Sequence, residues 1–147
     1  MDQVAKFSAP APGPGQCFMI EFPAHADKRG RVTFIESQRH VPFAIERIFY
    51  LYDVPAGESR GTHAHKVLEQ VMIAIAGSFE IKITDGRRQE KFVLDRPGAG
   101  LYIGPMLWQE VTNFSQGAVC LVLASKAYDE EEYFRDFKSF LLAVGSR

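Results

Sequence analysis

The side chains best suited to proton transfer or metal binding lie in one short stretch of the sequence, residues 61–70. It contains two of the four histidines, His63 and His65, and a carboxylate at Glu69. On a β-strand alternate side chains face the same way, so the two imidazoles would share one side. Glu69 would join them if the strand stayed regular. Placing three polar groups on an inward face costs desolvation free energy. A protein that keeps them there usually does so for a function, so we expect a site here.

The histidine pair admits three interpretations. The two rings could be ordinary surface or core groups without a function. They could bind a metal, because histidine nitrogens and a glutamate oxygen are common ligands of zinc and iron. They could also act without a metal as acid and base, since an imidazole with a pKa of about 6.5 exchanges protons near neutral pH.

The composition describes one domain without a strong overall charge. The chain has 147 residues, with 17 basic against 18 acidic side chains, and it shows no basic cluster suited to nucleic acid. Two isolated cysteines, Cys17 and Cys120, and a start without a signal-peptide pattern favour reduced thiols. No apolar run reaches the roughly 20 residues that span a bilayer. We therefore expect a cytoplasmic protein that binds neither nucleic acid nor a membrane.

Hydrophobic patterning predicts an all-β domain after a flexible N-terminal tail. Residues 1–16 are rich in proline and glycine and cannot build a core, so we expect a loose tail there. Short apolar segments bounded by Gly, Pro or charged residues then predict about nine strands. These are 17–22, 32–36, 45–52, 71–76, 79–84, 88–94, 101–103, 107–114 and 118–124. Such strands favour a double antiparallel sheet, a jelly roll with Greek-key connections.

The end of the chain changes to a helical period. Asp129 with Glu132 is similar to a capping box, and acidic residues fill the first turn that would follow. One apolar stripe would contain Tyr133, Phe137, Phe140, Leu141 and Val144. We predict a single C-terminal helix over 129–144, packed on the sheets of one domain spanning 17–147. The same stripe could instead bind a partner.

A first resemblance concerns the histidine stretch together with a later segment. The run from Gly57 through the histidine pair and Glu69 resembles the first motif of the cupin superfamily. Metal-binding cupins supply two His and one Glu from this motif and a further His from a later strand. The second motif is similar to residues 100–113, where Gln109 stands at the ligand position. A glutamine is a poorer ligand than imidazole for zinc, iron or nickel, so this departure counts against a metal centre.

A second resemblance is more specific. Residues 60–70 resemble the signature of small cupins that are sugar-nucleotide 3,4-ketoisomerases, and the similarity covers nearly everything from about Arg29 to Phe140. It includes residues 43–52, 100–105, 108, 110, 122–125 and 128–130. The resemblance implies that the ketone of dTDP-4-keto-6-deoxyglucose moves from C4 to C3 through an enediolate, without metal or cofactor. It places the reaction in deoxyamino sugar biosynthesis for O-antigen or S-layer glycans, and it implies a homodimer.

The resemblance also implies roles for individual residues. The histidine pair carries the proton transfers; we favour His65 as the base, with His63 assisting and Glu69 orienting both. Gln109, where relatives can carry histidine, would bind a sugar hydroxyl and, together with Arg29, influence the face on which C4 is protonated, because an amide cannot move a proton at neutral pH. The remaining candidates for substrate binding are Arg47, Tyr50, Arg60, Lys66 and Trp108.

Two alternatives to the ketoisomerase remain. One is a metal-dependent cupin enzyme. The other is a non-catalytic cupin that binds a sugar nucleotide, because Gln109 could mark a site that has lost its chemistry. Each candidate arginine could also be a solvated surface charge, and Tyr50 and Trp108 could belong to the core.

Overall fold

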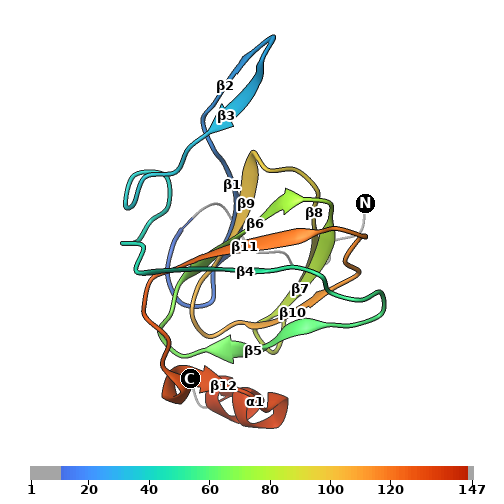
Figure 1. The fold of residues 1–147 in the computed structure, drawn as a ribbon. Coiled ribbons are helices and arrows are strands. Elements are labelled where there is room, and N and C mark those ends of the chain that lie inside the picture. Colours follow the sequence, from blue (N-terminus) through green and yellow to red (C-terminus); the bar gives the residue numbers. More distant parts are fainter. Residues whose placement is uncertain (1–10, 146–147) are drawn as a thin grey trace, which may run out of the picture.

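The computed structural model describes residues 11–145, in which two five-stranded antiparallel sheets face one another (Figure 1). The first sheet contains, in spatial order, β1 (Cys17–Glu21), β9 (Ala99–Ile103), β6 (Gln70–Ala76), β11 (Val119–Ala124) and β4 (Arg47–Leu51). The second contains β12 (Tyr133–Phe134), β5 (Arg60–His65), β10 (Trp108–Thr112), β7 (Phe79–Thr84) and β8 (Gln89–Leu94). The predicted all-β double sheet is confirmed.

The main core lies between the two sheets and follows the alternation of the strands. In β7, Ile81 and Ile83 are fully buried while Lys82 between them is exposed, as the period of two predicts. A second apolar cluster covers the other face of the first sheet, where Val71 and Ile73 pack with Phe43. β6 is therefore buried on both faces over most of its length, which explains its nearly continuous apolar sequence.

A two-stranded hairpin projects from this body at the top of Figure 1. It consists of β2 (Ala24–Asp27) and β3 (Gly30–Thr33), and every residue of both strands is exposed. The strand predicted over 32–36 thus ends at Thr33, because Ile35 leaves the hairpin and packs against the second apolar cluster.

The C-terminal helix is shorter than predicted. Asp129 caps only a 3-10 turn, η1 (Glu130–Glu132), which leads into β12; the helix α1 (Phe137–Gly145) begins eight residues later than expected. Asp136 provides the actual cap, because its carboxylate accepts hydrogen bonds from the amide and the hydroxyl of Ser139, at 3.0 and 2.9 Å. The helix does pack on the sheet, with Phe140 fully buried. No helix within residues 11–145 is long and apolar enough to cross a membrane.

Part of the predicted tail belongs to the folded domain. Residues 1–10 lie outside the described residues, but Gly13 and Gly15 donate backbone hydrogen bonds to the Tyr102 hydroxyl and the Pro105 carbonyl, at 2.9 and 2.8 Å. The close approach requires Gly104, because a Cβ at that position would lie 2.0 Å from the Gly13 carbonyl oxygen. The expectation of a loose tail is therefore wrong for residues 13–16.

Candidate active site

A cavity of about 400 Å³ lies between the two sheets, beside His63. Strands β4, β6 and β11 supply one wall, and β5, β10 and β12 supply the other. Its polar lining includes Arg60, His63, Gln70, Gln109 and Arg135, and its apolar lining includes Phe49, Met72, Val111, Val122 and Tyr133. Polar and apolar side chains thus contribute about equally, which suits a ligand that carries several hydroxyl or charged groups.

His63 is the titratable group on this cavity wall whose protonation is most strongly perturbed. Burial, together with positive charge on His65 and Arg135, lowers the pKa of His63 from 6.5 to about 3, against the opposing negative charge of Glu132 and Glu130. The ring has no hydrogen-bond partner among residues 11–145. A neutral imidazole at a cavity wall presents a nitrogen lone pair to a bound molecule, and nearby negative charge, which favours the protonated form, raises its pKa toward the range in which histidine acts as a base.

His65 lies directly behind His63. The two rings contact edge to face, with centroids 4.7 Å apart, so the strand spacing correctly predicted a shared side. His65 is only 4 % exposed and does not line the cavity, and its Nδ1 hydrogen-bonds the carboxylate of Glu132. The histidines therefore have different environments: His63 faces the cavity, and His65 is held from behind.

The C-terminal segment completes the site through β12. Tyr133 pairs with His65 across the sheet edge, and its ring centroid lies 4.9 Å from that of His63 and 4.5 Å from that of His65. Arg135 stacks on Tyr133, with its guanidinium carbon 4.1 Å from the ring centroid, and forms an ion pair with Glu130 at 2.8 Å. Glu132, Tyr133 and Arg135 are functional candidates that the sequence did not predict, because their segment had the pattern of a helix.

Gln109 lines the cavity, as predicted, and is only 1 % exposed. Its side-chain oxygen accepts a hydrogen bond from the amide of Gln70, a second buried glutamine that the sequence reasoning missed. The signal for Gln70 was available, since it is an uncharged polar residue at the start of the most apolar run. Gly61, at a φ of 62°, brings β5 close to Gln109; a Cβ on Gly61 would lie 3.4 Å from the Gln109 amide nitrogen.

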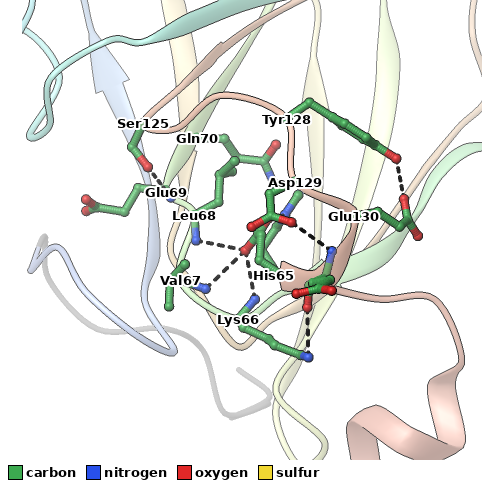
Figure 2. Close-up of polar contacts among 12 residues, drawn as sticks. His65, Lys66, Val67, Leu68, Glu69, Gln70, Ser125, Tyr128, Asp129 and Glu130 are labelled. Atoms are coloured by element: carbon green, nitrogen blue, oxygen red, sulfur yellow. Dashed lines mark hydrogen bonds and ion pairs between the residues drawn. The ribbon is translucent and has the colours of Figure 1, made fainter.

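Glu69 does not support the histidines. β5 ends at His65, and residues 66–69 form a bend before β6, so the alternation that would have aligned Glu69 with the pair is lost. Its carboxylate accepts a hydrogen bond from the Tyr102 hydroxyl at 2.5 Å, and Figure 2 shows it directed away from His65. The predicted orienting role is wrong for Glu69, and Glu132 occupies that position instead.

Three of the predicted substrate-binding residues lie outside the cavity. Trp108 faces outward on β10, opposite to Gln109, and packs against Phe137 and Phe140 of the helix. Lys66 is exposed, and its ammonium group donates a hydrogen bond to the carbonyl of Glu131 at 2.9 Å. Tyr50 is 58 % exposed on the outer side of β4. The alternation of strands explains Trp108 and Tyr50, since their neighbours Gln109, Phe49 and Leu51 are the residues that face inward.

The predicted arginines have different positions. Arg60 lines the cavity. Arg47 lies between the rings of Phe49 and Tyr128, at 5.0 and 5.6 Å, and its buried Nε has no hydrogen-bond partner in the part of the chain that the structure describes. Arg29 lies on the projecting hairpin, paired with Asp27 at 2.6 Å. Of these three predicted arginines, only Arg60 lines the cavity.

The residues present do not fit the metal centre of a metal-binding cupin. Gln109 replaces an imidazole ligand, and Glu69 is turned toward Tyr102. Among residues 11–145 no three His, Cys, Asp or Glu side chains are grouped so that they could hold a metal ion. The side chains at this cavity instead suit proton transfer.

A double-sheet β-fold with a histidine pair beside a cavity between the sheets is the architecture of a cupin-type protein. The chain belongs to the family described as FdtA: WxcM-like, C-terminal, whose model matches residues 15–145. The sequence-based assignment to the ketoisomerase cupins is thereby confirmed.

Individual relatives agree with this assignment. Over 122 residues the chain is 42 % identical to a TDP-4-oxo-6-deoxy-alpha-D-glucose-3,4-oxoisomerase of Aneurinibacillus thermoaerophilus, covering 83 % of this chain and 88 % of that protein. A 3,4-ketoisomerase structure from Helicobacter canadensis has 46 % identity and a TM-score of 0.85, over 88 % of this chain and 97 % of that one. A histidine-to-asparagine mutant of the 3,4-ketoisomerase QdtA from Thermoanaerobacterium thermosaccharolyticum, in complex with TDP-4-keto-6-deoxyglucose, has 38 % identity and a TM-score of 0.87, over 89 % and 95 %.

Proposed function

We propose that this protein is a sugar-nucleotide 3,4-ketoisomerase that acts on dTDP-4-keto-6-deoxyglucose. The observation that carries the proposal is the neutral His63 at an interior cavity, in a chain 42 % identical to an oxoisomerase of this specificity. The structural relatives bound to TDP or to TDP-4-keto-6-deoxyglucose support the same nucleotide and sugar.

The reaction needs two proton movements, one from C3 to C4 and one from O3 to O4. A base takes the proton from C3, the C3–H electron pair forms the C3–C4 double bond of an enediolate, and the carbonyl electron pair moves to O4. A proton then passes from O3 to O4, and protonation at C4 leaves the ketone on C3. His63 is the better candidate for the base, because it lines the cavity, whereas His65, which the sequence reasoning favoured, does not. No electrons are gained or lost overall, so the residues of the site suffice for the chemistry.

The other polar groups suit binding of the sugar and the diphosphate. Gln109 on β10 lies on the same wall of the cavity as His63 on β5, where it can hydrogen-bond a sugar oxygen. Its amide exchanges no proton at neutral pH. Arg60 and Arg135 are cations at the cavity that could bind the diphosphate, and Arg47 has a buried Nε that still needs an acceptor. Guanidinium groups favour this role because their planar fork meets phosphate oxygens in pairs.

We also propose a homodimer that works in the cytoplasm. The projecting hairpin is exposed throughout, and the outer side of the edge strand β4 presents Ile48 and Tyr50, each 58 % exposed. Edge strands and exposed apolar side chains favour pairing with a second copy of the chain. In such a dimer Arg29, on the projecting hairpin, would contact the second copy. Size-exclusion chromatography with light scattering tests the dimer; a monomer at micromolar concentration would contradict it.

The deciding experiment is proton NMR of the purified protein with dTDP-4-keto-6-deoxyglucose in deuterated water. We expect deuterium to replace the C3 proton and a 3-keto product to form, whose C4 signal reports its configuration. His63→Asn should abolish both, while His25→Asn, on the exposed hairpin, should leave both unchanged. Binding of the sugar nucleotide without exchange by the unmutated protein would instead identify a non-catalytic binder.

A further inference from the structure

The loop that follows the histidine strand is closed around one buried carboxylate, that of Glu132. This side chain is 7 % exposed and comes from the end of η1. One of its oxygens bonds Nδ1 of His65. The other accepts hydrogen bonds, each at 3.2 Å, from the backbone amides of Lys66, Val67 and Leu68. Figure 2 shows the hydrogen bonds of these three amides converging on a single oxygen beside His65.

This arrangement keeps the carboxylate charged although it is buried. Burial alone would raise the pKa of Glu132, but the hydrogen bond from Nδ1 of His65 and the amides of Val67 and Leu68 lower it overall, and a positive charge on the His65 ring, once Nε2 is also protonated, lowers it further. An ionised carboxylate can only accept hydrogen bonds. The proton between Glu132 and His65 therefore lies on Nδ1 of the histidine.

The second nitrogen of His65 is free to take part in proton transfer. With Nδ1 protonated, Nε2 of the neutral ring carries a lone pair, and Nε2 has no hydrogen-bond partner among the described residues. The negative charge of Glu132 also acts on His63, where it favours the protonated form, against the effects of burial and of positive charge on His65. Glu132 thus influences both rings without lining the cavity.

We propose that Glu132 is a positioning residue for the isomerisation: it fixes His65 in the tautomer protonated at Nδ1 and stabilises the positive charge that the histidine pair carries after removal of the C3 proton. The proposal rests on the proposed function. During the reaction the histidine pair carries the proton taken from C3, exchanges it with solvent and delivers a proton to C4, while Glu132 neither gains nor loses a proton.

A purely structural role is the competing explanation, because the same carboxylate also closes the loop of residues 66–68. The two roles differ in their response to charge. Glu132→Gln keeps the size of the side chain and an acceptor oxygen but removes the charge; we expect kcat to fall by roughly 10- to 100-fold, as for other residues that orient a catalytic histidine. KM should stay within about twofold, because Glu132 does not touch the cavity. The matched control, Glu131→Gln, alters an exposed neighbour and should leave both constants unchanged.

The kinetic comparison has a clear contrary result. Equal kcat values for Glu132→Gln and the unmutated protein would overturn the proposal, as would a rise in KM with an unchanged kcat. Glu132→Asp retains the charge and should keep more turnover than Glu132→Gln; the reverse order would contradict a role of charge.

Nitrogen-15 NMR of the unmutated protein tests the dyad even if the variants fold poorly. We expect His65 to be protonated at Nδ1, with a proton resonance shifted downfield by the hydrogen bond to the charged carboxylate of Glu132. An imidazole protonated at Nε2 only would overturn the proposal. This measurement needs no substrate, so it separates a failure of the dyad from a failure of the proposed function, which absence of C3 exchange in the unmutated protein would reveal.

Discussion

Replacement of His63 should change how the stability of the protein depends on pH. The pKa of this ring is 6.5 when exposed and about 3 in the folded protein, because burial disfavours the charged form. Between these two values the unfolded chain binds a proton at this position and the folded chain does not. Lowering the pH therefore stabilises the unfolded state, and the free energy of unfolding falls as the pH drops from 6.5 toward 3.

The size of this effect follows from the pKa difference. Each pH unit below 6.5 costs about 1.4 kcal/mol, so at pH 5 the unmutated protein loses about 2 kcal/mol of stability through His63 alone. His63→Asn removes the titrating group and with it this loss. Stability should therefore fall more gently between pH 7 and pH 5 in the variant, by about 2 kcal/mol, whatever the variant's stability at pH 7.

Urea unfolding at pH 7, 6 and 5 measures the difference, with fluorescence of Trp108, the single tryptophan, as the probe. His25→Asn serves as the control, because His25 is exposed on the projecting hairpin and its replacement should preserve the steep slope. Equal slopes for the unmutated protein and His63→Asn would mean that burial does not suppress protonation of His63. That result would refute the argument that a neutral imidazole faces the cavity.

Other substitutions separate the residues that bind substrate from those that maintain the fold. Trp108→Ala should cost roughly 2–3 kcal/mol in urea unfolding followed by circular dichroism, by removing the contact with α1, yet leave KM within about twofold; a large rise in KM would return Trp108 to the site. Gln109→Ala should instead lower kcat/KM by roughly tenfold or more in a coupled assay, because a sugar oxygen and Gln70 lose their partner. Gly61→Ala should lower stability by about 1–2 kcal/mol, since a φ of 62° is unfavourable for alanine, whereas Gly98→Ala should change stability by less than about 0.5 kcal/mol. Glu69→Gln should leave kcat unchanged and affect only the contact with Tyr102; a strong loss of turnover would restore the orienting role expected from the sequence.

The sequence predicted the sheet architecture because strand signals are local. Alternation of side chains within β7 and the apolar run of β6 needed no knowledge of the partner strands. The same alternation correctly placed His63 and His65 on one side of β5. The same alternation also means that adjacent residues on one strand face opposite sides, so Trp108 and Gln109 cannot both line the cavity.

The remaining site residues depended on tertiary contacts that local patterns do not specify. Asp129 and Glu132 have the spacing of a capping box, and Asp129 does cap a short turn. The Glu132 carboxylate, however, bonds His65, 67 positions earlier in the chain, and not the start of a helix. Nothing in the local sequence distinguishes these two fates of a glutamate. Tyr133 likewise contacts the histidines because β12 pairs with the edge of β5.

His63 and His65 are separated by a single residue on the same strand, but the fold gives them different environments. His63 is desolvated, unpartnered within the described chain and open to the cavity, so it suits the group that meets the substrate. His65 is enclosed, and the charge of Glu132 holds its ring. For such a pair to carry one proton, the ring that meets the substrate must be neutral at first. A nearby negative charge must then stabilise the cation that forms when this ring accepts the proton. The segment that supplies this charge also brings Tyr133 and Arg135 to the cavity, so the last strand of the sheet is as necessary to the site as the histidine stretch itself.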